Sequence, residues 1–430
     1  MIKVCDAIMG SGKSMSAAAY MNANHEKKFI YISPYKEDGP IMREKCPRLR
    51  MAVPATLPEF NCSKTNHCKK LIAEGRNIAC THELFKRYDK EVLQMIQEQH
   101  YTIIIDEEVA VMKECELHPG DIEVLLDAGY IYEDDMGNIL GTEKEYRGRV
   151  FRDFFYMMRN RNLYKCGGDD GAQYYYWQLP PDLLQAFDDV FILTYLFECQ
   201  DIKYMLDMHG MEYQYIYVCR TEGGGYFFSD EPSYLPAYVP HISDMIHICE
   251  EESLNACGKP DQRECPLSMN WFESGKHDAD VKQLKNNLYN YFRRHCGGAT
   301  AKERLWGTYK SLENDLRGKN YADCFLVFNK KGSNEYRNKR ALAYCVNLYV
   351  SPQIKNYYAK YGITPNEDER ALSIMIQWIW RSAIRDGQEI HIYIPSERMR
   401  NLLKDWMAKV EADAISGRWA QHGQQYEMAS

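Results

Sequence analysis

The sequence has no apolar run as long as a membrane-spanning helix, which needs about 20 residues. The chain has 430 residues, of which 45% are hydrophobic. Its first residues, MIKVCDAIM, are typical of a strand, which leaves no room for a signal peptide. We therefore expect a cytoplasmic protein with no membrane partner, and a length suited to two or three domains.

Closely spaced cysteine pairs are also missing. The 15 cysteines are scattered, and none forms a C-x2-C pair. The nearest approaches to a zinc site are Cys62 and Cys68 with His67, and a wider set of Cys249, Cys257 and Cys265. Both spacings are wide for zinc. The pattern favours free thiols in a reducing compartment.

An excess of positive charge is absent as well. The net charge is −8 and the pI is about 5.9, which argues against a protein that coats nucleic acid by charge alone. A local basic channel remains compatible with this balance. Internal repeats and low-complexity segments are absent. Aromatic residues are plentiful at 13%, which suits base stacking and equally an ordinary core.

The stretch Ala7–Ser14 (AIMGSGKS) fits the pattern Ala/Gly-x4-Gly-Lys-Ser/Thr of a phosphate-binding loop. A strand-like segment precedes it, and the helix-like segment SMSAAAYMNA follows. The glycines let the backbone approach a phosphate at a helix N-terminus, the lysine supplies positive charge, and the serine supplies a hydroxyl to Mg²⁺. The predicted nucleotide-binding residues are Gly10, Ser11, Gly12, Lys13 and Ser14. The alternative is a glycine-rich turn before an ordinary helix.

A second candidate motif follows the apolar run Tyr101–Ile105 (YTIII), which is typical of a central parallel strand buried on both faces. Asp106, Glu107 and Glu108 come directly after it. Carboxylates there emerge at the edge of the sheet where open α/β folds bind ligands. Asp106 would hold Mg²⁺, and Glu107 would orient or deprotonate the attacking water. The alternative is an acidic cluster on the surface.

Further strands of the first domain are expected at Phe29–Ser33, Asn77–Cys80 and Asp189–Leu196. The polar stretch Lys36–Gly75 contains the cluster KTNHCKK, for which we expect a solvated loop or, alternatively, a contact with a phosphate backbone. Residues 110–188 form an insertion with a hairpin at Tyr130–Leu140. It could separate strands, dock a partner or be a passive elaboration.

The second half contains a Gly- and Pro-rich seam between domains at Glu222–Pro240. Helices are expected at Asp280–Arg294 and Asp368–Arg385. Strands are expected at Tyr213–Cys219, Cys324–Phe328, Tyr344–Val350 and Ile390–Ile394.

Three polar residues of the second predicted helix, Gln377, Arg381 and Arg385, are spaced four apart and so would share one helix face. One interpretation is an exposed face with salt bridges. The other is an arginine finger that reaches a phosphate across a domain cleft.

Taken in order, the motifs AxxGxGKS, SPY, CTHELF, IIIDEE, LTY, FNKKGSN and QWIWRSAIR resemble the motif series of superfamily 2 helicases and translocases, the DEAD/DEAH-like group. More narrowly, the chain resembles the helicase-like proteins of phages and mobile elements that end in a QWIWRSAIR block. The resemblance spans nearly the whole chain, and its first, second and last motifs are the specific ones.

The resemblance implies an α/β fold with two RecA-like P-loop domains with parallel sheets, at residues 1–230 and 231–430, plus an α+β insertion in the first. It implies an ATPase that uses ATP and Mg²⁺ and acts on nucleic acid, with DNA favoured, in the cytoplasm of a bacterial host. The insertion at 110–188 could bind a replication protein.

By the same resemblance, Ser14 and Asp106 bind Mg²⁺, and Glu107 is the catalytic base. Nucleic-acid contacts fall at Pro34, Tyr35, Thr81, His82, Ser333 and Asn334, with Gly332 in the same loop. Thr194 couples hydrolysis to strand movement, and Gln377, Arg381 and Arg385 form the finger helix, with Arg381 the favoured finger.

Three departures from the family pattern stand out. Trp380 replaces the usual glycine of the last motif, and the second arginine comes one residue late. The adenine-reading motif would lie upstream of the phosphate loop, where this sequence has no room for it. Glu108 and Val109 follow Glu107, so that neither named box is matched. The alternative functions are a phage-type motor for packaging or assembly, and a nucleotide-dependent replisome recruitment factor.

Overall fold

The computed structural model describes residues 1–430 except 136, 168–172, 261–264, 331–333 and 418–430. The chain divides into two compact units. The first comprises Met1–Ile8, Gly12–Pro232 and Val350–Pro365, and the second comprises Met9–Ser11, Ser233–Tyr349 and Asn366–Ser430. The second unit therefore returns a short segment of chain, Val350–Pro365, to the first.

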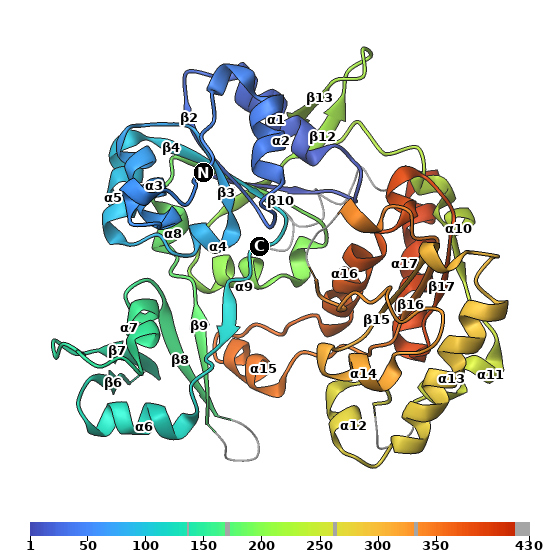
Figure 1. Cartoon of the computed structure of the whole chain (residues 1–430). Helices are drawn as coiled ribbons and strands as arrows, with labels where there is room; N and C mark the ends of the chain where they lie inside the picture. The colour runs from blue at the N-terminus through green and yellow to red at the C-terminus, as the bar shows by residue number, and fades with distance from the viewer. Residues whose placement is uncertain (136, 168–172, 261–264, 331–333, 418–430) are drawn as a thin grey trace. The chain divides into compact units, whose positions relative to one another are not determined.

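The first unit is built on a parallel sheet of six strands in the order β11-β1-β10-β4-β2-β3. Figure 1 labels β2, β3, β4 and β10 of this sheet. The strands are β1 (Ile2–Asp6), β2 (Lys28–Ser33), β3 (Ile78–Thr81), β4 (Tyr101–Asp106), β10 (Asp189–Thr194) and β11 (Tyr213–Tyr215). All six residues of β4 are buried, as expected for a central parallel strand. The carboxyl ends of all these strands share one edge of the sheet.

Helices accompany this sheet, as parallel connections require. They are α1 (Lys13–Ala23), α2 (Asp38–Lys45), α3 (Lys64–Ala73), α4 (His82–Phe85), α5 (Lys90–Gln99), α8 (Asp182–Gln185), α9 (Asp201–Met208) and α15 (Pro352–Ala359). The cluster KTNHCKK lies in α3, so the expectation of a loop there is wrong. Ser63 caps this helix by accepting a hydrogen bond from the Asn66 N–H, and Cys68 faces the core.

The insertion forms an antiparallel sheet of its own in the order β5-β9-β8-β7-β6. Its elements are β5 (Met112–Glu114), α6 (Pro119–Asp127), β6 (Ile131–Glu133), β7 (Asn138–Gly141), α7 (Arg152–Met158), β8 (Asn162–Gly167) and β9 (Gln173–Gln178). The expected hairpin is confirmed by the pairing of β6 with β7. A small core of its own, including Ile122, Leu163 and Trp177, makes this sheet a separate layer.

A separate hairpin follows β11. Its strands are β12 (Tyr217–Arg220) and β13 (Tyr226–Ser229), which pair in antiparallel fashion. The single strand expected at Tyr213–Cys219 is thus divided at Ile216, whose N–H donates to the Val4 carbonyl. Part of the stretch expected to be a domain seam is this hairpin, which lies against α1 (Figure 1).

The second unit contains a parallel sheet of four strands in the order β14-β17-β16-β15. The strands are β14 (Ile246–Ile248), β15 (Arg304–Gly307), β16 (Ala341–Tyr344) and β17 (Ile390–Tyr393). The helices are α10 (Ile242–Met245), α11 (Glu252–Asn255), α12 (Met269–Glu273), α13 (Asp278–Arg294), α14 (Glu313–Leu316), α16 (Glu367–Ile379) and α17 (Glu397–Ser416).

Three expectations for this unit are wrong in part. Cys324–Phe328 forms only an isolated bridge, between Phe325 and Trp306, instead of a strand. The strand expected at Tyr344–Val350 ends where it was expected to begin, at Tyr344. The helix expected to reach Arg385 ends at Ile379. The helix at Asp280–Arg294 is confirmed as α13.

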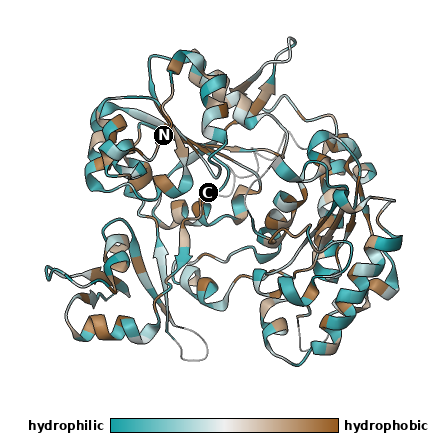
Figure 2. Ribbon diagram, in the orientation of Figure 1, coloured by the Kyte–Doolittle hydropathy of each residue, from teal (hydrophilic) through white to brown (hydrophobic). Residues whose placement is uncertain are grey.

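Apolar residues concentrate in the sheets, and hydrophilic residues cover the outer faces of the helices (Figure 2). Tyr357 and Tyr358 of α15 belong to the core of the first unit, together with the strands β1 to β4. In the part of the chain that the structure describes, no helix is both long and apolar enough to cross a membrane. The α/β fold class with two parallel sheets and an α+β insertion is confirmed.

Candidate nucleotide site

The motif Ala7–Ser14 connects the end of β1 to the start of α1. Gly10 and Gly12 have φ values of 74° and 97°, in the left-handed region that glycine adopts without strain. Gly12 is the N-cap residue of α1, and Lys13 is its first residue. The backbone N–H groups of the loop therefore end at a helix N-terminus, which favours anions.

The Lys13 side chain folds back over its own loop. Its ammonium Nζ donates to the carbonyl oxygen of Ala7 and to that of Ile8, the latter at 3.3 Å. Burial lowers the pKa of Lys13, whereas the neighbouring Cys5, Asp106 and Asp6 act to raise it. A phosphate bound in the loop would compensate this buried charge more fully than two carbonyl groups do.

Asp106, at the end of β4, is held by two hydroxyl groups. Ser14 Oγ and Tyr31 Oη each donate to Asp106 Oδ2 at 2.6 Å. Burial, and then the nearby Asp106 carboxylate, raises the pKa of Tyr31 well above its ordinary value, so the phenol keeps its proton and remains a donor. The serine of the first motif and the carboxylate of the second are thus in direct contact, although 92 residues separate them in sequence.

Glu107 has a φ of 63°, which is unusual for a residue other than glycine. Its N–H donates to the Leu193 carbonyl on β10 at 2.9 Å, which holds the backbone in this conformation. Tyr35 Oη donates to Glu107 Oε2 at 3.1 Å. Backbone strain held by surrounding contacts concentrates at functional positions in proteins. The turn redirects Glu107 from the line of the strand toward the loop that follows β2.

The other expected first-unit residues lie at the same carboxyl edge of the sheet. Pro34 and Tyr35 follow β2, Thr81 ends β3, and His82 begins α4. His82 is buried, and its Nε2 lies 3.0 Å from the Asp106 carbonyl oxygen. The His82 ring therefore supports the turn after β4. The other three residues of this group, Pro34, Tyr35 and Thr81, are half-buried and so remain partly accessible to solvent.

Thr194 ends β10 and is buried beside the phosphate loop. Its carbonyl accepts a hydrogen bond from the Ala7 N–H at 3.0 Å, and its Oγ1 accepts one from Gln200 Nε2 at 2.6 Å.

Two residues that contact the site, Gln200 and Tyr31, were not predicted from the sequence. The sequence gives no sign of either contact, because a tyrosine in the apolar strand FIYIS could equally pack in the core.

The expected finger residues do not share a helix face. Gln377 lies in α16 and donates to Ser373 Oγ at 3.4 Å, but Arg381 and Arg385 follow the end of the helix. Arg381 is buried, and Arg385 is exposed in the short 3-10 helix Ala383–Asp386.

The loop of the second unit that was expected to contact nucleic acid lies largely outside the described residues. This holds for Gly332 and Ser333, whereas Asn334 begins the 3-10 helix Asn334–Tyr336.

The cysteines are all free thiols. His67 lies between Cys62 and Cys68 in sequence, but its Nδ1 contacts the Ala55 backbone and its ring stacks on Phe60. Over the described ranges, no group of three or more His, Cys, Asp or Glu side chains could hold a metal ion.

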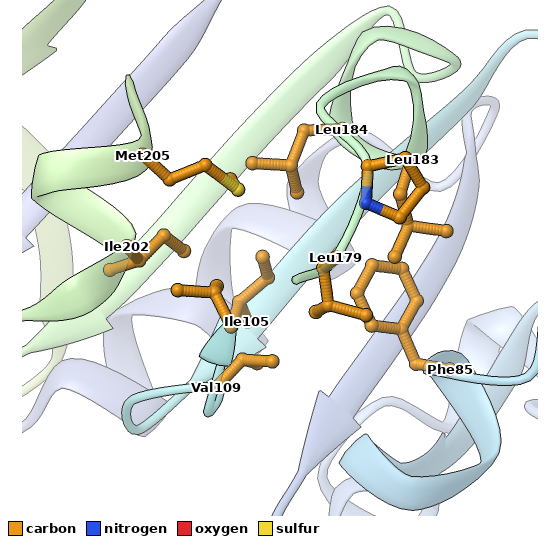
Figure 3. A pocket seen from close by; sticks show the side chains of 10 residues that line it. Phe85, Ile105, Val109, Leu179, Leu183, Leu184, Ile202 and Met205 are labelled. Carbon is orange, nitrogen blue, oxygen red and sulfur yellow. The ribbon is translucent and has the colours of Figure 1, made fainter. Parts of the chain in front are cut away.

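A small apolar hollow lies beside β4 in the core of the first unit (Figure 3). Its volume is about 10 Å³, and its lining includes Phe85, Ile105, Leu179 and Met205. It has no polar lining and is too small for a ligand, so we interpret it as imperfect packing.

These features define a mixed α/β protein in which the first of two parallel-sheet units places Ser14 of a phosphate-loop motif beside an acidic strand end. The chain belongs to the YonV family. It is 35% identical over 416 residues to the SPbeta prophage-derived uncharacterized protein YonV of Bacillus subtilis (strain 168), and the alignment covers 94% of this chain and 98% of that protein. Residues 240–407 match the family described as the YonV C-terminal Rossmann-like domain.

The chain is also similar to solved structures of XPD. An XPD helicase structure has 11% identity and a TM-score of 0.46, with 94% of each chain covered. An XPD structure in the apo form has 12% identity and a TM-score of 0.49, with 94% of this chain and 95% of that chain covered. Xpd4 of S. tokodaii has 11% identity and a TM-score of 0.47, with 94% of each chain covered.

Proposed function

We propose that this chain is a nucleic-acid-stimulated ATPase of the helicase or translocase type. The contact between Ser14 and Asp106 carries the proposal, because it brings the hydroxyl of the phosphate loop to the carboxylate of the acidic strand end. In P-loop NTPases, these two groups hold the metal ion that accompanies the nucleotide phosphates.

The residues present fit Mg²⁺. Ser14 and Asp106 offer hard oxygen ligands on neighbouring elements, and Mg²⁺ prefers such ligands together with phosphate oxygens and water. The metal would neutralise charge on the phosphates when bound. Tyr31 orients the Asp106 carboxylate, while Lys13 and the loop N–H groups bind the phosphates.

Glu107 is the proposed base for the attacking water. Its carboxylate is held by the Tyr35 hydroxyl, and its backbone is fixed to β10. Tyr35 is also a proposed contact to nucleic acid, along with Pro34 and Thr81. A nucleic-acid strand bound at this edge would therefore act on the residue that orients the base, which provides a route for stimulation of hydrolysis.

Nucleic acid is the proposed partner on the strength of the motif series, and DNA is favoured over RNA. The curated relative is described as prophage-derived, which supports a role in phage or mobile-element replication or recombination. The insertion sheet, β5 to β9, is the proposed docking module for a replication protein. A second parallel sheet in the same chain supports a two-lobed motor over a packaging ring built from one lobe per chain.

The first test is the steady-state ATPase rate with single-stranded DNA, duplex DNA, RNA and no nucleic acid. We expect hydrolysis in the presence of Mg²⁺ and stimulation by single-stranded or forked DNA. Stimulation should weaken with added salt, because phosphate contacts release counterions. ATP binding without stimulation by any nucleic acid would instead support a recruitment factor.

The matched variants are Lys13→Ala and Lys27→Ala. Lys13→Ala should abolish hydrolysis, because the loop loses its positive charge. Lys27 lies beyond the end of α1 and pairs with Asp189, so its variant should retain the wild-type rate. A Lys13→Ala protein that folds and hydrolyses ATP at the wild-type rate would overturn the assignment of the loop.

A further inference from the structure

The hairpin of β12 and β13 is packed firmly on the helix that follows the phosphate loop. Ser16 Oγ of α1 donates to the Phe227 carbonyl at 3.3 Å. The Phe228 ring stacks on Phe191 at a centroid distance of 5.8 Å and contacts Tyr20 at 6.5 Å. These contacts come from both α1 and β10, so the hairpin has a fixed position beside α1 (Figure 1).

Tyr226, the first residue of β13, lies directly against the phosphate loop. A Cβ atom placed on Gly12 would be 2.4 Å from Cδ1 of the Tyr226 ring. Glycine is therefore required at this position both by its φ of 97° and by the aromatic ring. Tyr226 is only half-buried, and its ring edge lies beside Gly12, the N-cap residue of α1.

Arg220 is the cross-strand partner of Tyr226, and its guanidinium lies over the Tyr226 ring at 5.6 Å from the centroid. The turn between them is closed by Thr221, whose N–H donates to the Gly225 carbonyl at 2.8 Å and whose Oγ1 accepts from the Gly225 N–H at 2.9 Å. A planar cation and an aromatic ring are thus held together by a short, well-bonded hairpin.

We propose that this hairpin supplies the platform for the nucleobase, with the base stacked on Tyr226 and Arg220 holding the ring. The inference rests on the proposed function, because it takes the triphosphate to lie in the adjoining loop. In a nucleotide, the ribose places the base six covalent bonds beyond the α-phosphorus, so a base whose phosphates bind at the N-terminus of α1 can reach the Tyr226 ring next to Gly12.

The chemistry of this platform favours a purine nucleotide. Every base can stack on an aromatic ring, but stacking strength grows with the area of the base, so a two-ring purine gains more from the Tyr226 ring than a one-ring pyrimidine does. Stacking of a base on an aromatic side chain is a substantial part of nucleotide affinity in other proteins. The platform discriminates ATP from CTP more strongly than it discriminates ATP from GTP.

The test compares two ligands, Mg-ATP and inorganic tripolyphosphate, by titration calorimetry on the full chain. Tripolyphosphate occupies the loop but has no base. Tyr226→Ala should raise the Kd for ATP roughly tenfold, in line with the loss of one base–aromatic stack, and leave the Kd for tripolyphosphate unchanged. Tyr226→Trp should retain ATP affinity, because a larger ring preserves the stack.

Phe227→Ala is the matched control. Phe227 is the next residue on the same strand, its side chain is 42% exposed, and the strand alternation directs it to the opposite face. We expect this variant to bind both ligands as the wild type does.

The outcomes separate the two proposals. A wild-type protein that binds neither ligand overturns the proposed function. If the wild type binds both and Tyr226→Ala leaves ATP affinity unchanged, the platform is wrong and the phosphate loop stands. Equal weakening of both ligands by Tyr226→Ala also overturns the platform, because it shows that the ring only supports the loop.

Discussion

The Asp106 side chain depends on two hydroxyl groups, and one of them belongs to a residue outside every motif. Tyr31 is 2% exposed and donates to the same oxygen that Ser14 contacts. Hydrogen bonds to ligating carboxylates orient them, and loss of such a partner costs about 10- to 100-fold in metal affinity or activity in other proteins.

We therefore expect Tyr31→Phe to raise the Mg²⁺ concentration needed for half-maximal ATPase activity by about tenfold. The fold should be retained, because only one oxygen is removed. The measurement is ATPase rate as a function of Mg²⁺ concentration at saturating ATP.

Tyr101→Phe is the matched control for this experiment. Tyr101 is also a buried tyrosine of the first sheet, but its hydroxyl donates to the Arg76 carbonyl at 2.7 Å, away from Asp106. An identical Mg²⁺ dependence in Tyr31→Phe and Tyr101→Phe would show that Tyr31 does not orient the carboxylate.

Short motifs made part of the site predictable. The pattern around Lys13 gave a strand, a loop with two positive-φ glycines and a helix, and the structure has all three. The roles of Tyr31 and His82 could not be inferred, because they depend on which strands neighbour β4. In sequence, a tyrosine in an apolar strand looks the same whether it packs or donates a hydrogen bond.

At the scale of elements, long periodic segments were predictable and their ends were not. The helix α16 follows its apolar periodicity to Ile379, but the sequence beyond, WRSAIR, contains no glycine or proline to stop it. The chain turns there because the Ala383 N–H donates to the Lys339 carbonyl, a contact between distant residues. Tertiary contacts of this kind override local preference.

The helix α15 is an element whose location could not be predicted. It lies between two segments of the second unit, yet Tyr357 and Tyr358 are buried in the core of the first. Tyr357 Oη donates to Gln178 Oε1 at 3.3 Å, and Tyr358 Oη donates to Asp201 Oδ1 at 3.0 Å. These contacts join residues 179 and 157 positions apart in the chain.

We expect Tyr358→Ala to destabilise the first unit by about 4 kcal/mol, because it removes a fully buried aromatic side chain and leaves a cavity. In calorimetry, the unfolding transition of the first unit should move to a temperature lower by about 10 °C. The transition of the second unit should stay in place.

Tyr361→Ala provides the comparison for this experiment. Tyr361 is in the same segment of chain but is 37% exposed, so its loss should change the stability of the first unit far less. Equal decreases in the unfolding temperature of the first unit in the two variants would show that the buried contacts of Tyr358 add no stability beyond that of an exposed tyrosine.

On the scale of the whole molecule, the motor proposal requires a positive charge from the second unit to act on the nucleotide of the first. Arg381 and Arg385 are the candidates, and they differ in environment, since Arg381 is buried and Arg385 is exposed. We expect Arg381→Ala to retain ATP binding and to lose most of the DNA-stimulated turnover, by on the order of 1,000-fold for a finger.

The measurement is the ATP Kd together with turnover with and without single-stranded DNA, for Arg381→Ala, Arg385→Ala and the control Arg317→Ala. Arg317 is a partly exposed arginine of the same unit that pairs with Asp323. Loss of stimulation in Arg385→Ala alone would make Arg385 the finger. Full stimulation in both variants would leave the second unit without a catalytic role.

Because Val350–Pro365 belongs to the first unit, a cut of the chain between the two units at Pro232 separates the first unit from part of its own core. A truncated product that stops at Pro232 would lack Tyr357 and Tyr358, and would expose to water the apolar side chains that these two tyrosines cover. Conversely, the rest of the chain would carry α15 with the apolar face that includes Tyr357 and Tyr358 exposed to water. The two halves are therefore interdependent for solubility, although each is organised around a sheet of its own.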